Sequence, residues 1–475
     1  MGRPRTQATR VLVIALPVLL VLAVVTLGGS LFAPGYANQL AGGPSLGWHP
    51  GKPVAPAPQV LGALGADAPA PTADGVSAAV KPKLTDPALG SHTVVSVADL
   101  ATGQQLYDQE STAPTVPAST LKVLTAVSAL KARGATYRLE TRAVAGAAPG
   151  EVVLVGGGDP TLGGGEKRTF ADGARLDDLA AQVRKALGGT PPTKVVVDGS
   201  LFGAPYSGPG WDPDVVAPSP NAAPITALMI DGGRVRPVGP HGPYDRVAEP
   251  DLAAGKSFAA ALGVPAGAVS RGTAPAGANQ LGAVQSPPME RLVELMLVES
   301  DNVIAESLAR QVALAKNQPA TFAGGAAAMT AVLGELGLPV DGVVLADGSG
   351  LSRLNRVTAK LLTQALLLAT KDDHPELRAV FPGLPVAGYS GTLQIRYRKA
   401  GSGAAVAGLV RAKTGSLGGI SAVAGFLVDA DGRALAFSMI ADKVLDNGAT
   451  PTTASPSQEA LDRVTTALAA CGCHS

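Results

Sequence analysis

The sequence predicts a fold that mixes α-helices with antiparallel β-strands in the outer parts of the chain and has a separate region in the middle. Three observations predict this. Short runs rich in β-branched residues alternate with turn signals, which is typical of paired strands. Apolar residues recur at helical spacing between those runs. The middle region has strands and helices of its own, which favours a second domain.

Strands near both ends of the chain form the first group of predicted elements. The runs Thr93–Val97 and Gln105–Tyr107 flank the turn Ala101-Thr102-Gly103 and predict a hairpin. Near the C-terminus, three further runs predict adjacent antiparallel strands, because a tight turn at Asp429–Gly432 joins the last two. These runs are Gly408–Ser416, Ile420–Val428 and Ala434–Ile440.

Apolar spacing predicts the helices. Those of the outer parts are Pro117–Leu130, Met289–Val312 and Pro456–Leu468. The middle region predicts strands at Val152–Val155 and Lys194–Asp198 and helices at Leu176–Leu187 and Leu252–Leu262. The stretch from Phe202 to Pro243 is rich in Pro and Gly, and it predicts no regular element.

The N-terminal residues 1–33 predict a signal anchor or a signal peptide. Arg3, Arg5 and Arg10 precede an apolar run from Val11 to Gly29, which is close to the ~20 residues that span a bilayer as a helix. This length favours an uncleaved anchor, although Gly35-Tyr36-Ala37 would serve as a cleavage site. Either outcome places the rest of the chain outside the cytoplasm. Residues 34–85 are rich in Ala, Pro and Gly and predict a flexible linker.

Composition and charge exclude some partners. The formal net charge is +1, and 4% of the residues are aromatic. Such a chain has little long-range field and few rings to stack on bases, so we expect no nucleic-acid partner. Cys471 and Cys473 lie in a terminal run with His474, which is too few ligands for a closed zinc site. We interpret that run as an exposed terminus, with a disulfide to another chain as one option.

Three short motifs occur in a fixed order along the chain. They are Ser119-Thr120-Leu121-Lys122 at a helix start, Ser300-Asp301-Asn302 entering a helix, and Lys413-Thr414-Gly415 on a predicted strand. Each alone is commonplace, because serine and aspartate often cap helices and lysine is usually solvated. Together and in this order they form the signature of β-lactamases and penicillin-binding proteins.

Ser119 is the candidate nucleophile and Lys122 its candidate base. Residues three positions apart lie on one helix face, so the Lys122 amine reaches the Ser119 hydroxyl. The positive end of the helix dipole favours a neutral amine and stabilises an alkoxide. Lys413, as a second cation nearby, would lower the Lys122 pKa further. A neutral lysine can then take the serine proton, and no histidine is needed.

The other motif residues are candidates for proton transfer and substrate binding. Ser300 would relay a proton to the leaving amine, and the backbone N–H groups of Ser119 and Ser416 would form an oxyanion hole. Asn302 would hold the substrate amide. Lys413 and Thr414 would bind a carboxylate, so we expect a substrate that ends in one. The predicted substrate-binding residues are Asn302, Lys413, Thr414, Gly415 and Ser416.

The chain from about His92 to its C-terminus resembles the low-molecular-mass class C penicillin-binding proteins, the D-alanyl-D-alanine carboxypeptidase/endopeptidases. Beyond the three motifs, the resemblance rests on Gly156–Pro160, Asp347–Arg353, Leu384–Gly388 and Gly391–Leu393. It implies a β-lactamase/transpeptidase-like α/β (α+β) catalytic domain, with an antiparallel sheet flanked by helices. It also implies hydrolysis of peptidoglycan stem peptides ending in D-Ala-D-Ala through an acyl-enzyme on Ser119, acylation by β-lactams, and no metal or cofactor.

The same resemblance implies a domain layout. The family inserts accessory domains after the first motif, and the long separation of Ser119 from Ser300 leaves room for one main insertion. We therefore expect a catalytic domain in two parts, residues 86–150 and 283–475, around an inserted domain at 151–282. The inserted domain would act as a scaffold or contact peptidoglycan.

Two other functions fit part of the pattern. A β-lactamase would share the motifs but needs a base that activates water, and Glu166 is a poor candidate because it lies in a Gly-rich stretch. A wall-binding scaffold would keep the fold without catalysis, which the complete set of motifs disfavours.

Overall fold

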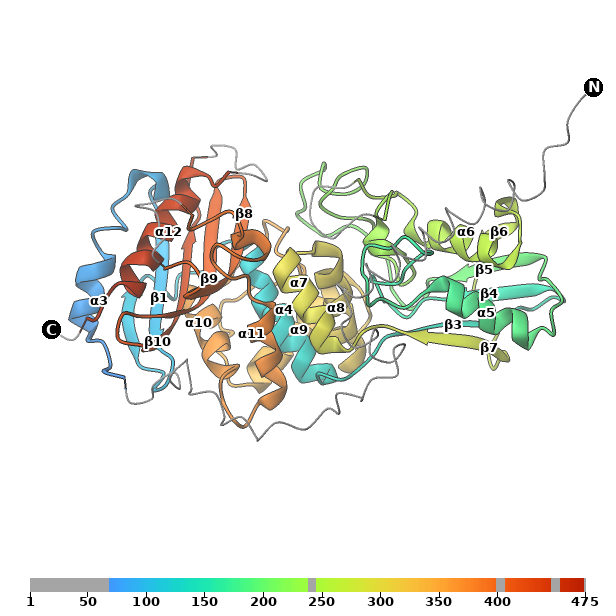
Figure 1. Cartoon of the computed structure of the whole chain (residues 1–475), viewed down its shortest axis with the longest axis horizontal. Helices are drawn as coiled ribbons and strands as arrows, with labels where there is room; N and C mark the ends of the chain where they lie inside the picture. Colours follow the sequence, from blue (N-terminus) through green and yellow to red (C-terminus); the bar gives the residue numbers. More distant parts are fainter. Residues whose placement is uncertain (1–67, 238–244, 399–405, 446–452, 474–475) are drawn as a thin grey trace, which may run out of the picture. The chain divides into compact units, whose positions relative to one another are not determined.

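Two β-sheets organise the part of the chain that the computed structural model describes, residues 68–237, 245–398, 406–445 and 453–473. The strand order is β2-β1-β10-β9-β8 in the first sheet and β6-β5-β4-β3-β7 in the second (Figure 1). The predicted targeting segment, residues 1–33, lies outside the described residues. Within the described residues, no helix is both long enough and apolar enough to cross a membrane.

The first sheet is antiparallel throughout and joins distant parts of the sequence. Its strands are β1 (Thr93–Asp99), β2 (Gln105–Gln109), β8 (Val410–Leu417), β9 (Ile420–Val428) and β10 (Ala434–Ala441). β1 pairs along its whole length with β10. The predicted hairpin and the predicted run of three C-terminal strands are both confirmed.

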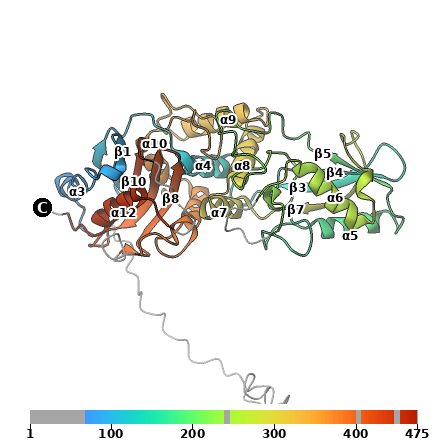
Figure 2. The same ribbon diagram turned by 90° about the horizontal axis from the view of Figure 1, so that it is seen from above.

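Helices cover both faces of the first sheet (Figure 2). One side has α4 (Lys122–Arg133), α7 (Met289–Glu299), α8 (Asn302–Ala315), α9 (Phe322–Glu335), α10 (Ala359–Leu368) and the short α11 (Val380–Gly383). The other side has α3 (Ala73–Val80) and α12 (Pro456–Ala469). Successive side chains of a strand face opposite ways, so Val94 packs in the core with α4 and its neighbour Val95 packs in the core with α12. The predicted antiparallel sheet flanked by helices is confirmed.

The predicted linker at 34–85 is wrong for part of its described length. Residues Ala73–Val80 form α3, and the Thr72 hydroxyl caps this helix by accepting from Gly75 N at 3.1 Å. Val76 and Val80 are fully buried in the core that α12 also enters. The Ala-rich composition predicted a flexible segment, but two valines one turn apart form an apolar face once another helix covers it.

The C-terminal cysteines pair with one another. A disulfide joins Cys471 to Cys473, so the option of a disulfide to another chain is replaced by one within the terminus. The backbone N and Oγ1 of Thr72 both donate to Cys473 O, at 2.8 and 3.1 Å. The terminus therefore lies against the start of α3.

The second sheet is mixed. Its strands are β3 (Glu140–Ala145), β4 (Glu151–Val155), β5 (Lys194–Asp198), β6 (Val269–Arg271) and β7 (Gln280–Gln285). β4, β5 and β6 are parallel, and β3 and β7 are antiparallel to their neighbours. Parallel neighbours need crossover connections, and α5 (Leu176–Ala186) and α6 (Pro250–Leu262) are part of them. Both helices pack on one face of this sheet.

The second sheet extends beyond the predicted insertion at 151–282. β3 starts at Glu140 and β7 ends at Gln285, and these two residues are paired. Just outside them, Ser286 N donates to Leu139 O at 2.8 Å, and Leu139 N donates to Ser286 Oγ at 2.9 Å. The chain thus enters and leaves at one point, as is common for an inserted unit. Residues 139–286 are called the second-sheet region below.

The stretch between β5 and α6, where the sequence predicted no element, packs against the helices of the first sheet. Phe202 and Ile225 share a small core with Val303 of α8 and Phe322 of α9. The Trp211 indole Nε1 donates to Asp347 Oδ2 at 2.8 Å. This irregular stretch therefore connects the second-sheet region to the helices that surround the motifs.

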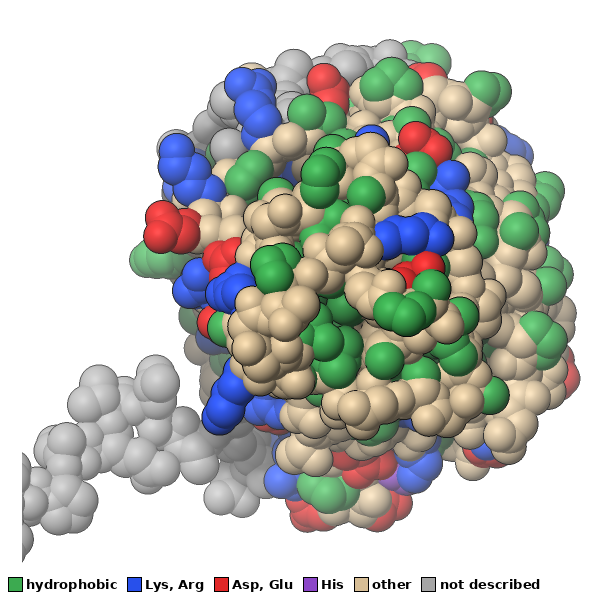
Figure 3. Space-filling model, turned by 90° about the vertical axis from the view of Figure 1, so that its right-hand side faces the viewer, with side chains coloured by type: hydrophobic (Ala, Val, Ile, Leu, Met, Phe, Trp, Pro, Cys, Tyr) green, Lys and Arg blue, Asp and Glu red, His purple; other side chains and the backbone are tan. Residues whose placement is uncertain are grey.

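The face of the molecule in Figure 3 carries basic and acidic side chains next to one another, among apolar and uncharged ones. Among the described residues of this face, no broad area of one sign stands out. The mixture is in keeping with the formal net charge of +1.

Candidate active site

Ser119 lies in a single 3-10 turn, η2 (Ala118–Leu121), that leads directly into α4. The first residue of α4 is Lys122, and its Nζ lies 2.9 Å from Ser119 Oγ. Ser119 is partly exposed, whereas Lys122 is fully buried. The candidate nucleophile and base are therefore in direct contact, as their spacing predicted.

The Lys122 amine has two further partners, and both are acceptors. Its Nζ lies 2.7 Å from Asn302 Oδ1 and 2.7 Å from the backbone oxygen of Ser349. A neutral amine has two hydrogens and one lone pair. When Asn302 and Ser349 take the two hydrogens, the lone pair is left for the Ser119 hydroxyl.

Burial dominates the electrostatics of both lysines in the site. It lowers the pKa of Lys122 to about 8, while the charges of Asp347, Glu306 and Asp301 oppose this and raise it. The pKa of Lys413 is lowered well below its usual value, first by burial and then by the Lys122 charge. We expected Lys413 to lower the pKa of Lys122. Instead, burial does so, and the closeness of the two cations lowers the pKa of Lys413.

The Ser300-Asp301-Asn302 motif forms the junction between α7 and α8. Ser300 ends α7 in the left-handed region, with φ 55° and ψ 33°, which is uncommon for a residue other than glycine. Asp301 caps α8, because its Oδ1 accepts from Val303 N at 2.9 Å and Ile304 N at 3.0 Å. The motif is thus a helix cap that also delivers Asn302 to Lys122.

The Asn302 amide is held from both ends. Its Oδ1 accepts from Lys122, and its Nδ2 donates to Asn221 O at 3.0 Å. Asn221 belongs to the second-sheet region. No sequence pattern marked it, because it contributes a backbone carbonyl from a stretch without periodicity.

β8 brings the third motif against the turn that carries Ser119. Lys413 is fully buried within it. A Cβ at Gly415 would lie 2.8 Å from Pro117 O and 3.2 Å from the Ala118 Cβ. Glycine therefore allows this close approach of strand and turn.

The two remaining candidates on β8 contact neighbouring elements. Thr414 Oγ1 donates to Thr392 Oγ1 at 2.7 Å. The exposed Ser416 accepts from Gln458 Nε2, at the start of α12, at 2.9 Å. Thr392 lies in the stretch Gly391–Leu393, which supported the family resemblance but was given no role in the site. Gln458 was not predicted to belong to the site.

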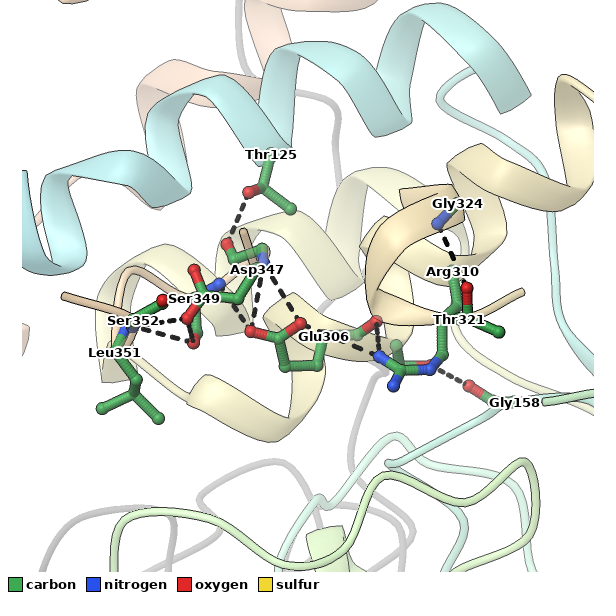
Figure 4. A network of polar contacts seen from close by, with 12 residues as sticks. Thr125, Gly158, Glu306, Arg310, Thr321, Gly324, Asp347, Ser349, Leu351 and Ser352 are labelled. Carbon is green, nitrogen blue, oxygen red and sulfur yellow. Dashed lines mark hydrogen bonds and ion pairs between the residues drawn. The ribbon is translucent and has the colours of Figure 1, made fainter. Parts of the chain in front are cut away.

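A buried turn begins at Asp347 (Figure 4). Its Ser349 carbonyl accepts from the Lys122 amine. The Asp347 carboxylate closes this turn by accepting from Gly350 N at 2.9 Å and Ser352 N at 2.7 Å. A Cβ at Gly350 would lie 1.9 Å from Ala118 O, and its φ is +85°. Only glycine fits where the turn touches the residue before Ser119.

Glu306 of α8 holds the same turn (Figure 4). Its carboxylate accepts from Gly348 N at 3.1 Å and from Ser349 N at 2.8 Å. Burial raises the pKa of Glu306 to about 7, and the Asp347 charge adds to the effect. Sequence reasoning missed Glu306. A lone carboxylate on a helix with a broad apolar face was the one available signal.

The site consists of amine, hydroxyl and amide groups with buried carboxylates behind them. Among the described residues, no group of three or more His, Cys, Asp or Glu side chains is placed to hold a metal ion.

A family comparison decides the identity of the chain. The sequence model of the D-Ala-D-Ala carboxypeptidase 3 (S13) family matches residues 76–239 and 238–466, which include all three motifs. The chain belongs to the S13 D-Ala-D-Ala carboxypeptidase family. The predicted resemblance is confirmed.

Relatives of this S13 chain cover most of its length. A carboxypeptidase of Mycobacterium tuberculosis is 41% identical over 408 residues, 85% of each chain. Carboxypeptidase DacB of Mycolicibacterium smegmatis is 39% identical over 429 residues, 89% of this chain and 90% of the relative. Among solved structures, penicillin binding protein 4 of Haemophilus influenzae aligns with a TM-score of 0.65 at 23% identity, over 82% of this chain and 97% of that one. The structural match supports the fold.

S13 membership also settles the class of reaction. The chain is a D-Ala-D-Ala carboxypeptidase of that family, a hydrolase. Neither the β-lactamase nor the non-catalytic scaffold is favoured.

Proposed function

We propose that this S13 enzyme removes the terminal D-alanine from peptidoglycan stem peptides through an acyl-enzyme on Ser119, with Lys122 as the base. The contact of 2.9 Å between Lys122 Nζ and Ser119 Oγ carries the proposal. A general base must lie within hydrogen-bond reach of the proton that it takes, and its pKa should be close to the working pH. Lys122 meets both requirements, because burial lowers its pKa to about 8.

Acylation begins as Lys122 accepts the Ser119 proton and Oγ bonds to the carbonyl carbon of the penultimate D-Ala. The carbonyl oxygen becomes an oxyanion, for which the N–H groups of Ser119 and Ser416 are the proposed donors. Each such donor is worth about 3 kcal/mol. The peptide C–N bond then breaks. The proton held by Lys122 passes through Ser300 to the leaving amine, and D-alanine departs.

Deacylation uses the same groups with water as the nucleophile. Lys122 accepts a proton from the water as its oxygen bonds to the ester carbonyl carbon. The bond from that carbon to Ser119 Oγ breaks, and Lys122 returns its proton to Oγ. The shortened peptide leaves as a carboxylic acid, and both side chains regain their starting states.

Lys413 and Thr414 are the proposed binding site for the terminal carboxylate of the substrate. A nearby anion raises the pKa of a lysine, so an arriving carboxylate would restore the charge that burial disfavours on Lys413. β-Lactams carry a carboxylate as well. The Haemophilus influenzae protein has been solved with a β-lactam, and we propose that this class of inhibitor acylates Ser119.

An extracytoplasmic location belongs to the same proposal. Peptidoglycan lies outside the cytoplasmic membrane, and residues 1–33 have the charge and apolar pattern of an export or anchor segment. We propose that this segment places the enzyme at the wall, as an anchor in the membrane.

The test is covalent labelling of the full chain by a fluorescent penicillin, together with D-alanine release from a muropeptide that ends in D-Ala-D-Ala. Ser119→Ala should abolish both. Ser270→Ala, on β6 of the second sheet, should retain both. Labelling that survives Ser119→Ala would exclude this serine. Rapid penicillin turnover without D-alanine release would favour a β-lactamase.

A further inference from the structure

Two buried arginines of the second-sheet region share the aspartate of the Ser300-Asp301-Asn302 motif. Arg234 Nη2 lies 3.0 Å and Arg246 Nη2 lies 3.4 Å from Asp301 Oδ2. The side chains are 2%, 6% and 2% exposed, for Arg234, Arg246 and Asp301. Charges this deep in a protein are costly unless they are paired, so the three groups depend on one another.

Asp301 divides its two oxygens between two tasks. Oδ1 caps α8, and Oδ2 accepts from the arginines. The flanking residues are Ser300, the proposed proton relay, and Asn302, which contacts Lys122. Ser300 has the left-handed backbone of its junction, a conformation that persists where surrounding contacts enforce it. The ion cluster is a contact that fixes this junction from outside its own helices.

The arginines also hold the stretch that touches Asn302. Arg246 donates through Nε to Pro220 O at 3.3 Å and through Nη1 to Gly232 O. Arg234 donates through Nη1 to Asp231 O at 3.0 Å. Next to Pro220 is Asn221, whose carbonyl accepts from Asn302 Nδ2 at 3.0 Å. A continuous set of contacts therefore runs from the arginines through Asn302 to the Lys122 amine.

We propose that Arg234 and Arg246 are positioning residues for catalysis, which hold Ser300 and Asn302 in the geometry that Lys122 needs. They act through Asp301 and through the Asn221 carbonyl. The second-sheet region is then a required part of the active site as well as a scaffold. The inference rests on the proposed function of Ser119 and Lys122.

The choice of variants separates positioning from folding. Arg246→Gln and Arg234→Gln remove a charge from Asp301. Arg246→Lys and Arg234→Lys retain the charge but lose the planar donors that reach the carbonyls. Arg271→Gln is the matched control, because Arg271 is also an arginine of the second-sheet region that binds carboxylates, Asp251 and Glu249, away from the motif.

The readouts are the acylation rate with fluorescent penicillin, kcat and KM for D-alanine release, and the melting temperature of the full chain. We expect each Gln variant to lose roughly 10²-fold in kcat, with a smaller change in KM. The Lys variants should fall between these and the wild type, and Arg271→Gln should retain the wild-type kcat. A loss of folded protein alone would lower the amount of active enzyme and leave kcat per labelled site unchanged.

Wild-type kcat in folded Gln variants would overturn the inference. If the Gln variants do not fold, the Lys variants decide: wild-type kcat at an unchanged melting temperature would overturn it, and reduced kcat would support it. Failure of the underlying function would give a different result, because the Ser119→Ala variant would then still be labelled.

Discussion

At the scale of single residues, Lys122 is under two opposing influences. Burial lowers its pKa, three carboxylates raise it, and the result is about 8. At pH 7 such an amine is neutral in about one molecule in ten. The rate lost to incomplete deprotonation is therefore about tenfold, or about 1.4 kcal/mol, against about 10³-fold for a solvated lysine. The charges of the carboxylates therefore reduce the rate only modestly. In return, Glu306 and Asp347 fix the turn that orients the Lys122 amine.

Glu306→Gln is expected to move the pH dependence of acylation to lower pH. In the wild type, the rate should rise with pH around 8, as Lys122 loses its proton. Above about pH 7 Glu306 is ionised, and its charge stabilises the Lys122 ammonium. Glutamine keeps an oxygen for the backbone donors of the turn but has no charge, so Lys122 should deprotonate at a lower pH. The measurement is the rate of labelling by fluorescent penicillin against pH.

Glu335→Gln is the control for that experiment. Glu335 lies on α9, is 52% exposed, and pairs with Lys316 at the surface, where ion pairs contribute little. Its pH profile should match the wild type. A midpoint for Glu306→Gln that stays in place or moves to higher pH would contradict the assigned electrostatic effect on Lys122.

At the scale of elements, the site is formed where β8 meets the turn η2. β8 is an edge strand of the first sheet, and it pairs with β9 through Lys413↔Ala424 and Gly415↔Ala422. Side chains two apart on a strand share a face. Lys413 and Gly415 therefore face the turn together, and the distance between strand and turn is set by the absence of a side chain at Gly415.

Gly415→Ala is expected to slow acylation by roughly 10²-fold, because a misplacement of about 1 Å has an effect of that size. The added methyl would lie 2.8 Å from Pro117 O, so the strand or the turn must shift. Overpacking of this kind costs about 1–3 kcal/mol of folding free energy. Labelling rate and melting temperature measure the two effects. Gly267→Ala, where a Cβ meets open space, should alter neither, and a wild-type labelling rate in folded Gly415→Ala would refute the close-approach argument.

The same scale shows which features were predictable from the sequence. β9 and β10 have long apolar runs between clear turns, and their predicted ranges agree closely with the structure. β3 and β7 were missed because each is partly polar and they pair with one another from far apart in the sequence, although β3 also pairs with the nearby β4. At the site, the contact between Ser119 and Lys122 could be predicted from their spacing. The Ser349 carbonyl and the Glu306 carboxylate were not, because their roles arise from tertiary contacts alone.

At the scale of the whole molecule, the second-sheet region is attached at more than its point of entry. Beyond the pair Leu139 and Ser286, its irregular stretch packs Trp211 against Phe322 with ring centroids 5.4 Å apart. The buried cluster of Arg234 with Asp301 is a second attachment. Contacts of this kind couple the stability of the two parts, so we expect them to unfold together.

Trp211→Ala is expected to weaken that coupling. The substitution removes the ring packing and the hydrogen bond to Asp347, and truncation of a large aromatic residue costs roughly 3 kcal/mol. Calorimetry of the wild type should give one unfolding transition. The variant should give either one transition at a lower temperature or two separate transitions. Trp211→Phe keeps a ring and should lose less. Two transitions in the wild type, or a variant that melts like it, would contradict the coupling. Because the same stretch supplies the Asn221 carbonyl to Asn302, any separation of the two parts should also reduce acylation.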